Sequence, residues 1–339
     1  MAAPTIVGLD IGSTSIRAVE TGREKDRPLV VNAAHVPLPP GAVSGGVIAD
    51  PHAVTTALTQ LWSAAKFRSR RVVLGVTHHQ VVVREMSVAN VPARERQKSL
   101  PFQVRDVLPL PVERALLDFW PLEDPGQNRT VRGLLIAAPK EAVLGMVKAV
   151  EKAGLHVERV DLASFALLRA ASRLDTQVEA LVDIGYRTTS VVVHADGEPL
   201  IVRTIPRGGH DITDAIAKQL DVDLDEAEAL KCELGLRPGP NQAATMVIKE
   251  AVRPLISEIR SSFAYLTAGD RQTRVTRLAI CGGGALLPGL DEALADDLQI
   301  EVTPADATVR VHTAAASHGS LDAFRPTAAV SIGLTLGAA

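Results

Sequence analysis

The alternation of apolar and polar residues near the start of the chain predicts a β-hairpin. Residues 6–9 and 16–19 are short, mostly apolar runs, and the segment between them is rich in glycine, serine and threonine. Such runs on either side of a small-residue segment are typical of two strands joined by a tight turn. Because Asp10 directly follows the first run, the pattern places a carboxylate at the mouth of the hairpin.

The same pattern recurs near the middle of the chain. Residues 180–193 read ALVDIGYRTTSVVV and repeat the Asp-Ile-Gly, hydroxyl and β-branched order of residues 7–20. A repeat separated by half the chain predicts a duplicated α/β fold whose halves face each other across a cleft. Amide and hydroxyl groups at two such turns suit the two ends of one polyphosphate. Asp10 and Asp183 suit a hydrated Mg²⁺ ion, which uses few carboxylates.

A strand, a glycine turn and a helix are predicted near the C-terminal end. Residues 278–281 are apolar, residues 282–284 are three glycines, and residues 288–298 have a helical pattern. Glycines let the backbone approach a flat ligand closely. The segment lacks the lysine of a Walker A loop and the spacing of a dinucleotide-binding loop. Its position after the second hairpin is therefore what makes it informative.

Two helices are predicted between the second hairpin and the glycine turn. Gly208 and Gly209 precede the first helix, and a helix N-terminus can bind an anion. Asp225 is the candidate cap of the second helix, on which Glu228 and Lys231 share a face. For this pair, an ion pair in solvent and a contact with a ligand both remain open.

Composition and charge exclude several classes of protein. Apolar residues make up 46% of the 339 residues and charged residues 22%, as in globular proteins. The net charge of −3 and the scattered basic residues give no footprint for nucleic acid. Cys232 and Cys281 have no C-x-x-C spacing, which favours a reducing compartment, the cytoplasm. Since no run approaches the roughly 20 apolar residues of a membrane span, we expect membrane association only through partners.

In this order, the two hairpins and the triple-glycine turn resemble the actin-like ATPase superfamily, which includes actin, Hsp70, sugar kinases and FtsA. The resemblance implies an actin-like (ribonuclease H-like) α/β fold with duplicated halves, a central nucleotide cleft and an inserted α+β subdomain. It implies ATP and Mg²⁺ as ligands, with the metal held by Asp10 and Asp183 through water. The residues that it implies for nucleotide binding are Asp10, Gly12, Ser13, Thr14, Ser15, Arg17, Asp183, Gly185, Thr188, Thr189, Gly208, Gly209, Glu228, Lys231, Gly282, Gly283 and Gly284. Arg17 departs from the lysine common in FtsA-like members, and its planar guanidinium is not a point charge.

The middle of the chain resembles the PilM family of type IV pilus assembly proteins. Residues 102–122 and 134–170 carry this resemblance, with strands expected at 116–122 and 134–138 and a helix ending at Gly154. The implied first half has its core at 1–77, the inserted subdomain at 78–158 and a return helix at 159–176. The implied second half begins with the first part of its core at 177–199 and a small helical subdomain with the nucleotide-binding helix at 200–265. Residues 266–339 complete the second-half core with the adenosine motif and return to the first half.

Through this resemblance, the chain is expected to be an ATP-binding scaffold at the cytoplasmic face of the inner membrane. Its nucleotide state would control binding of the N-terminal cytoplasmic peptide of a PilN-like membrane protein. Other implied interactions are with further pilus assembly proteins, including the assembly ATPase, and with other copies of the chain. At most slow ATPase activity is expected, and Asp161 is the weak candidate for orienting the water.

Two alternative functions remain open, and the aromatic residues suggest where the peptide groove lies. An FtsA-like cell-division protein would carry a C-terminal amphipathic membrane helix, whose composition the final residues SIGLTLGAA lack. A small-molecule kinase of the same superfamily would need a carboxylate base, and the inserted subdomain shows no obvious one. Phe102, Phe119 and Trp120 are expected to line the peptide groove, although the core of their own subdomain is the commoner fate of aromatic residues.

Overall fold

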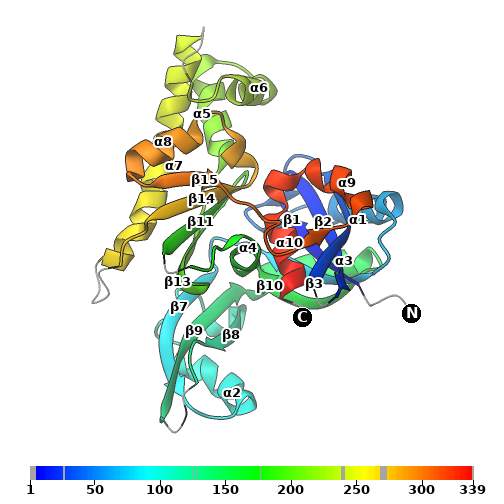
Figure 1. The fold of residues 1–339 in the computed structure, drawn as a ribbon, viewed down its shortest axis with the longest axis vertical. Coiled ribbons are helices and arrows are strands. Elements are labelled where there is room, and N and C mark those ends of the chain that lie inside the picture. Colours follow the sequence, from blue (N-terminus) through cyan, green and yellow to red (C-terminus); the bar gives the residue numbers. More distant parts are fainter. Residues whose placement is uncertain are drawn as a thin grey trace.

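The computed structural model describes residues 5–25, 27–124, 126, 128–175, 177–237, 241–267 and 273–337. Two large sheets form the body of the molecule, and a smaller sheet projects from it (Figure 1). The first sheet has the order β10 (His156–Leu162), β6 (Arg71–Val76), β1 (Ile6–Ile11), β2 (Ser15–Glu24), β3 (Arg27–Pro37) and β16 (His312–Thr313). The second has the order β13 (Glu198–Ile205), β12 (Thr189–Ala195), β11 (Val178–Ile184), β14 (Arg277–Cys281) and β15 (Glu301–Pro304).

The remaining elements cover these sheets or extend from them. The helices are α1 (Pro51–Ala65), α2 (Ala93–Gln103), α3 (Lys140–Lys152), α4 (Ala163–Ala171), α5 (Gly209–Leu220), α6 (Leu224–Leu234), α7 (Gln242–Thr267), α8 (Leu290–Leu298), α9 (His318–Asp322) and α10 (Ala329–Leu336). The remaining strands are β4 (Val43–Ser44), β5 (Val47–Ile48), β7 (Val82–Ala89), β8 (Ala115–Pro121) and β9 (Thr130–Pro139). None of the helices within the described ranges combines the length and hydropathy that a transmembrane span requires.

The first strand of each hairpin lies in the interior of its sheet and has a partner strand on both sides. β1 pairs antiparallel with β2 and parallel with β6, and β11 pairs antiparallel with β12 and parallel with β14. The partner of Asp10 across its hairpin is Arg17, and the partner of Asp183 is Ser190. The two halves therefore repeat one topology, which is what the sequence repeat predicts.

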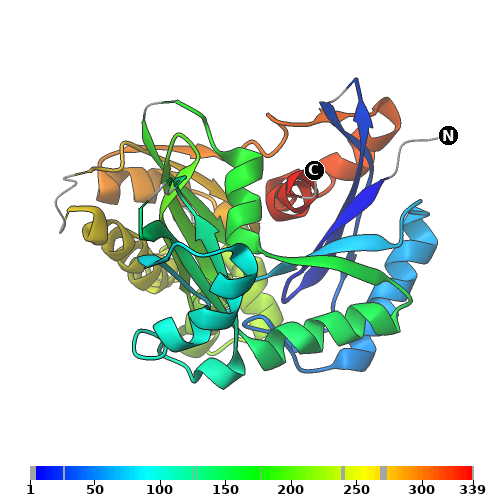
Figure 2. The ribbon, with the colours of Figure 1, turned by 90° about the horizontal axis from the view of Figure 1, so that it is seen from below.

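The first sheet is covered on both faces. Successive strand residues point to opposite faces, so Val72 and Leu74 pack in the cluster that includes α1 and α3, whereas Val73 packs with α4 and α10. Figure 2 shows α10 lying between α4 and the strands of the first half. The chain thus returns from the second half to complete the core of the first.

The projecting sheet, of order β7-β9-β8, carries α2 and has its own small core. Phe119 is buried in that core with Val88 and Leu135, so it does not line a groove. In contrast, Phe102 and Trp120 are 80% and 65% exposed. Of the three aromatic residues expected to line the peptide groove, only Phe102 and Trp120 are therefore exposed enough to contact a peptide.

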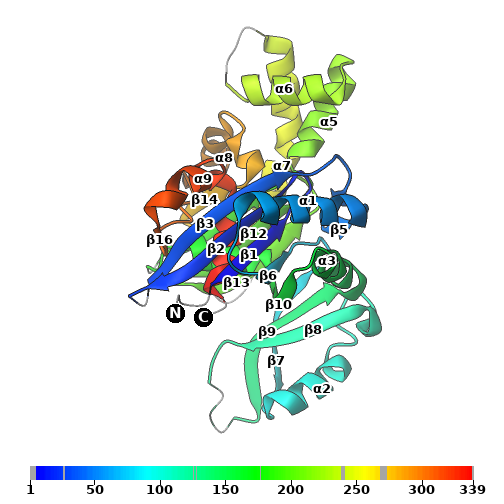
Figure 3. The same cartoon turned by 90° about the vertical axis from the view of Figure 1, so that its right-hand side faces the viewer.

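The helix α3 packs outside this small core. Its residues Val143, Met146 and Val150 are buried in the main core of the first half, and Figure 3 shows α3 between α1 and strands β8 and β9. Because removing α3 would open that main core, we propose residues 82–139 as the extent of the inserted subdomain, which is narrower than 78–158.

Candidate functional site

A cleft of about 630 Å³ is lined by residues of both halves. It collects the tips of the two hairpins, one side of α5 and α6, and the turn that follows β14. The residues of the sequence prediction that line it are Asp10, Gly12, Ser13, Thr14, Ser15, Arg17, Asp183, Gly185, Thr188, Gly209, Glu228, Lys231, Gly283 and Gly284. The fold therefore brings together residues as far apart in the sequence as Asp10 and Gly284, which are 274 positions apart.

The two hairpin tips have the same backbone geometry. The Gly12 amide donates to the Ser15 carbonyl at 3.0 Å, and the Gly185 amide donates to the Thr188 carbonyl at 2.9 Å. Within the described residues, no hydrogen bond engages the amides at the tips, which are those of Ser13, Thr14, Tyr186 and Arg187. Each tip can thus present two amide donors to an anion in the cleft.

Asp10, Arg17 and Asp183 form the charged floor of the cleft. The Arg17 Nε atom lies 3.4 Å from Asp10 Oδ2 and is buried without a hydrogen-bond partner. Asp183 is partly open to the cleft, yet burial raises the pKa of its carboxyl to about 6. The positive charge of Arg17 lowers this pKa, and the negative charge of Asp10 raises it further. A cation added here would relieve this unfavourable charge, because an opposite charge favours the ionised form.

The glycine turn packs directly on Asp183. At Gly282 a Cβ atom would lie 2.2 Å from Asp183 Oδ1, and its φ of +89° suits glycine. At Gly284 a Cβ atom would lie 2.4 Å from the Ile184 side chain, whereas at Gly283 it would meet nothing within 4 Å. Gly282 thus permits close packing beneath the cleft, while Gly283 and Gly284 form part of its wall.

A buried lysine joins α5 to α6. The Lys231 Nζ atom donates to the Gly209 carbonyl at 3.2 Å, to Thr213 Oγ1 at 2.9 Å and to Glu228 Oε2 at 2.6 Å. Burial alone would raise the pKa of Glu228, but the hydrogen bonds from Lys231 and Thr213 hold it below its usual value. The pair is therefore not a solvated surface pair. It sets the position of the α5 N-terminus at the edge of the cleft.

Four residues of the prediction do not line the cleft: Thr189, Gly208, Gly282 and Asp161. The buried Thr189 hydroxyl donates to the Arg207 carbonyl at 2.8 Å. The Asp161 carboxylate forms an ion pair with Arg169 and is not among the residues that line the cleft.

The amides at the start of α5 are also occupied. The Gly208 amide donates to Asp211 Oδ2 at 2.8 Å, and the Gly209 amide donates to the Gly185 carbonyl at 3.0 Å. The helix N-terminus therefore supports the second hairpin tip and has no free amide there for an anion. The cap of α6 also differs from the expectation, because Asp223, not Asp225, accepts from the Glu226 amide.

Several cleft residues were missed by the sequence analysis. The Tyr186 and His210 rings lie 4.8 Å apart, and the Arg187 guanidinium lies 5.8 Å from the Tyr186 ring centre. Tyr186 and Arg187 occupy the places of Ser13 and Thr14 in the repeat, so alignment of the two hairpins could have found them. Nothing local marks Leu286 or Thr327, which reach the cleft only through the tertiary fold.

Comparisons with known proteins agree with this architecture. A solved structure titled "PilM-PilN type IV pilus biogenesis complex" matches with a TM-score of 0.85 at 29% identity, covering 99% of this chain and 98% of that chain. MreB 5 of Spiroplasma citri bound to AMPPNP matches with a TM-score of 0.54 at 15% identity, covering 98% and 95% of the two chains. The actin-like fold expected from the sequence is thereby confirmed.

Two sequence comparisons extend this result. The cell division protein FtsA of Bacillus subtilis (strain 168) is 24% identical over 340 residues, which cover 87% of this chain and 77% of FtsA. The family model described as "Type IV pilus assembly protein PilM" matches residues 8–339. Because this match spans nearly the whole chain, the protein belongs to the PilM family of type IV pilus assembly proteins.

Proposed function

We propose that the chain binds ATP with Mg²⁺ in the cleft and that its nucleotide state controls capture of the N-terminal cytoplasmic peptide of a PilN-like inner-membrane protein. The observation that carries the nucleotide proposal is the pair of matching hairpin tips, whose unengaged amides line one cleft. Amides arranged in this way bind phosphate oxygens without needing a specific side chain. The chain would act at the cytoplasmic face of the membrane through this partner.

The charged floor fits a hydrated magnesium ion. Asp10 and Asp183 line the cleft from opposite halves, and the raised pKa of Asp183 marks a carboxylate that a cation would stabilise. Among the described residues there is no group of three or more metal-ligating side chains. This agrees with Mg²⁺, which keeps several waters and uses one or two carboxylates together with phosphate oxygens. When bound, the ion would neutralise phosphate charge.

The remaining cleft residues are assigned by their position. Arg17 and Arg187 place guanidinium groups at the two hairpins, where they would contact phosphate oxygens. Glu228 on α6 and the wall formed by Gly283 and Gly284 also line the cleft, and they would contact the ribose and the base. Asp161 is held by Arg169, so we assign it no part in hydrolysis.

The peptide proposal is supported by two observations. A solved structure similar to this chain over nearly its whole length is titled as a PilM–PilN complex. The inserted subdomain also exposes apolar side chains: Leu116 and Trp120 lie on the same face of β8, and both are exposed. An exposed apolar face next to an edge strand suits an extended peptide, whose backbone can pair with the strand.

The nucleotide proposal is tested by calorimetry on Asp10→Ala and Asp183→Ala. Each substitution removes one carboxylate from the metal, so we expect the affinity for ATP·Mg²⁺ to fall more than tenfold, or about 1.4 kcal/mol. Asp296→Ala, at an exposed position on α8, is the matched control and should bind as the wild type does. Unchanged affinity in both cleft variants would overturn the proposal.

A further inference from the structure

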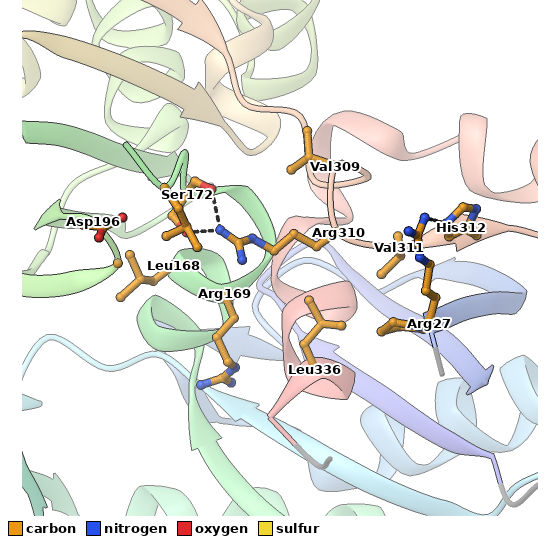
Figure 4. A pocket seen from close by; sticks show the side chains of 13 residues that line it. Arg27, Leu168, Arg169, Ser172, Asp196, Val309, Arg310, Val311, His312 and Leu336 are labelled. Atoms are coloured by element: carbon orange, nitrogen blue, oxygen red, sulfur yellow. Dashed lines mark hydrogen bonds between the residues drawn. The ribbon is translucent and has the colours of Figure 1, made fainter. Parts of the chain in front are cut away.

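A second cavity, of about 740 Å³, shares no lining residue with the cleft. Its walls come from the start of β3, α4 and the residues after it, the β12–β13 turn, residues 309–312 and the end of α10 (Figure 4). It therefore lies between the two halves, at a place that the proposed nucleotide site does not use. Its size is within the usual range for small-ligand pockets, about 300–1,000 Å³.

Arg310 is the most unusual residue in this cavity. Its Nη2 atom donates to the Ser172 carbonyl at 2.9 Å and to Ser172 Oγ at 3.1 Å, and Figure 4 shows the guanidinium directed at Ser172. Its Nε atom is buried without a hydrogen-bond partner. Within the described part of the chain, no carboxylate lies within ion-pair distance of this side chain. Since Nε is shielded and Nη2 is bonded to Ser172, the donor that remains for a ligand is Nη1, which has no hydrogen bond to the residues that the structure describes.

A second guanidinium also lacks a carboxylate partner. Arg27 Nη1 lies 3.3 Å from His312 Nε2, and no ion pair joins Arg27 to any residue that the structure describes. Arg169 differs, because its charge is offset by Asp161. Among the described lining residues, Asp196 is the single acidic side chain. The cavity therefore carries an excess of positive charge from Arg27 and Arg310.

Apolar side chains border the same cavity. Leu174 and Val309 both line it, and they are 55% and 61% exposed. Neither side chain is covered by the fold, although each lies on the wall of a concave site. A ligand with an anionic group and an apolar group would cover these side chains while it pairs with the guanidinium groups.

We propose that this cavity binds a phosphate ester that carries an apolar group. The Arg310 guanidinium contacts the phosphate oxygens, since its N–H donors match a phosphate group. Arg27, which is directed at His312 on another wall (Figure 4), adds positive charge that attracts the anion. Leu174 and Val309 contact the apolar part. Two sources share this chemistry, the headgroup of an anionic phospholipid and a soluble phosphate ester.

The experiment uses the full chain with two probes. Phenyl phosphate is titrated by calorimetry, and vesicles of phosphatidylglycerol and phosphatidylcholine are tested by co-sedimentation. We expect binding in at least one arm, and at least a tenfold loss of affinity in Arg310→Gln. Arg27→Gln, at the exposed first residue of β3, should lose affinity at least threefold and serves if Arg310→Gln fails to fold. Binding to phenyl phosphate alone identifies a soluble ester, and binding to vesicles alone identifies the lipid.

Arg253→Gln is the matched control, because it removes an exposed guanidinium on α7 that lines neither the cleft nor the cavity. It should bind both probes as the wild type does. Absence of binding in both arms by the wild-type chain overturns the proposal. So does normal binding by folded Arg310→Gln together with Arg27→Gln, or a loss of binding in Arg253→Gln alone. None of these outcomes depends on ATP binding.

Discussion

At the scale of single residues, the cleft contains a carboxylate held in an unfavourable state. Burial raises the pKa of Asp183 from 3.8 to about 6, and Gly282 packs so closely on this carboxylate that a Cβ atom there would lie 2.2 Å from Asp183 Oδ1. A raised carboxyl pKa means that ionisation weakens the folded state more than the unfolded state. The ligand-free protein therefore carries a stability cost above pH 6 that a bound cation would offset.

We expect Asp183→Asn to raise the stability of the ligand-free protein at pH 8. The cost of the ionised carboxylate is absent below about pH 4, grows as the pH rises through the interval from 3.8 to about 6, and is constant above it. With partial solvent access taken into account, the expected gain in the free energy of unfolding is about 1–2 kcal/mol at pH 8 and close to zero at pH 4. Urea denaturation at both pH values measures it. An equal effect at the two pH values would contradict the assignment.

Neighbouring glycines of the turn should respond differently to substitution. Gly282→Ala places a Cβ atom against Asp183 at a positive φ, so we expect a loss of about 1–3 kcal/mol in the free energy of unfolding. Gly283→Val has open space for its side chain and should fold as the wild type does, yet lose ATP affinity because the side chain projects into the cleft. Denaturation and calorimetry on both variants separate the two effects. Normal ATP binding by Gly283→Val would place the base elsewhere.

At the scale of elements, α5 and α6 are joined by one buried cation. The side chain of Lys231 is 8% exposed and bridges both helices through Gly209, Thr213 and Glu228. Because Gly209 also donates to Gly185, the position of α6 is linked to the tip of the second hairpin. The two helices thus act as one unit at the edge of the cleft.

Lys231→Met is expected to loosen this unit. It leaves Glu228 and the Gly209 carbonyl without their shared donor, and we expect a loss of about 2 kcal/mol in stability together with weaker ATP binding. Lys218→Met is the matched control on α5, since the Lys218 side chain is 72% exposed and, among the residues that the structure describes, its one ion pair is with Asp214. Thermal denaturation of the two variants makes the comparison. Equal effects would show that the buried bridge has no special importance.

At the scale of the whole molecule, the inserted subdomain projects from the body (Figure 1), and none of its described residues lines the cleft. Coupling between them requires that nucleotide and peptide each prefer one arrangement of the two halves. Thermodynamic linkage then demands that each ligand change the affinity for the other by the same factor.

We therefore expect ATP·Mg²⁺ and the partner peptide to change each other's affinity by one common factor. Fluorescence titrations of each ligand, with and without saturating amounts of the other, measure it. Trp120→Ser should weaken peptide binding at least fivefold. It should leave the ATP affinity unchanged, because the exposed Trp120 side chain is not among the residues that line the cleft. Met246→Ser, at an exposed apolar position of α7, is the control. If Trp120→Ser binds the peptide with full affinity, the peptide site does not include the face of β8 that carries Leu116 and Trp120.

The sequence by itself determined the two hairpins, the glycine turn and the duplicated fold. These features depend on local chemistry: strands need alternating or β-branched apolar residues, and tight turns need small residues, so both are visible in short windows of sequence. The residues at the hairpin tips follow from the same windows, and they line the cleft as expected.

Only the tertiary structure decided which groups at these motifs are free. It assigned the Gly208 and Gly209 amides and the Thr189 hydroxyl to neighbouring protein atoms, and it paired Asp161 with Arg169. It also placed α3 in the main core and brought Arg27 and Arg310 to one cavity. A sequence pattern specifies which side of an element is buried, but the partner that buries it comes from a distant segment. Hydrogen-bond saturation and charge compensation are therefore settled only when the elements pack.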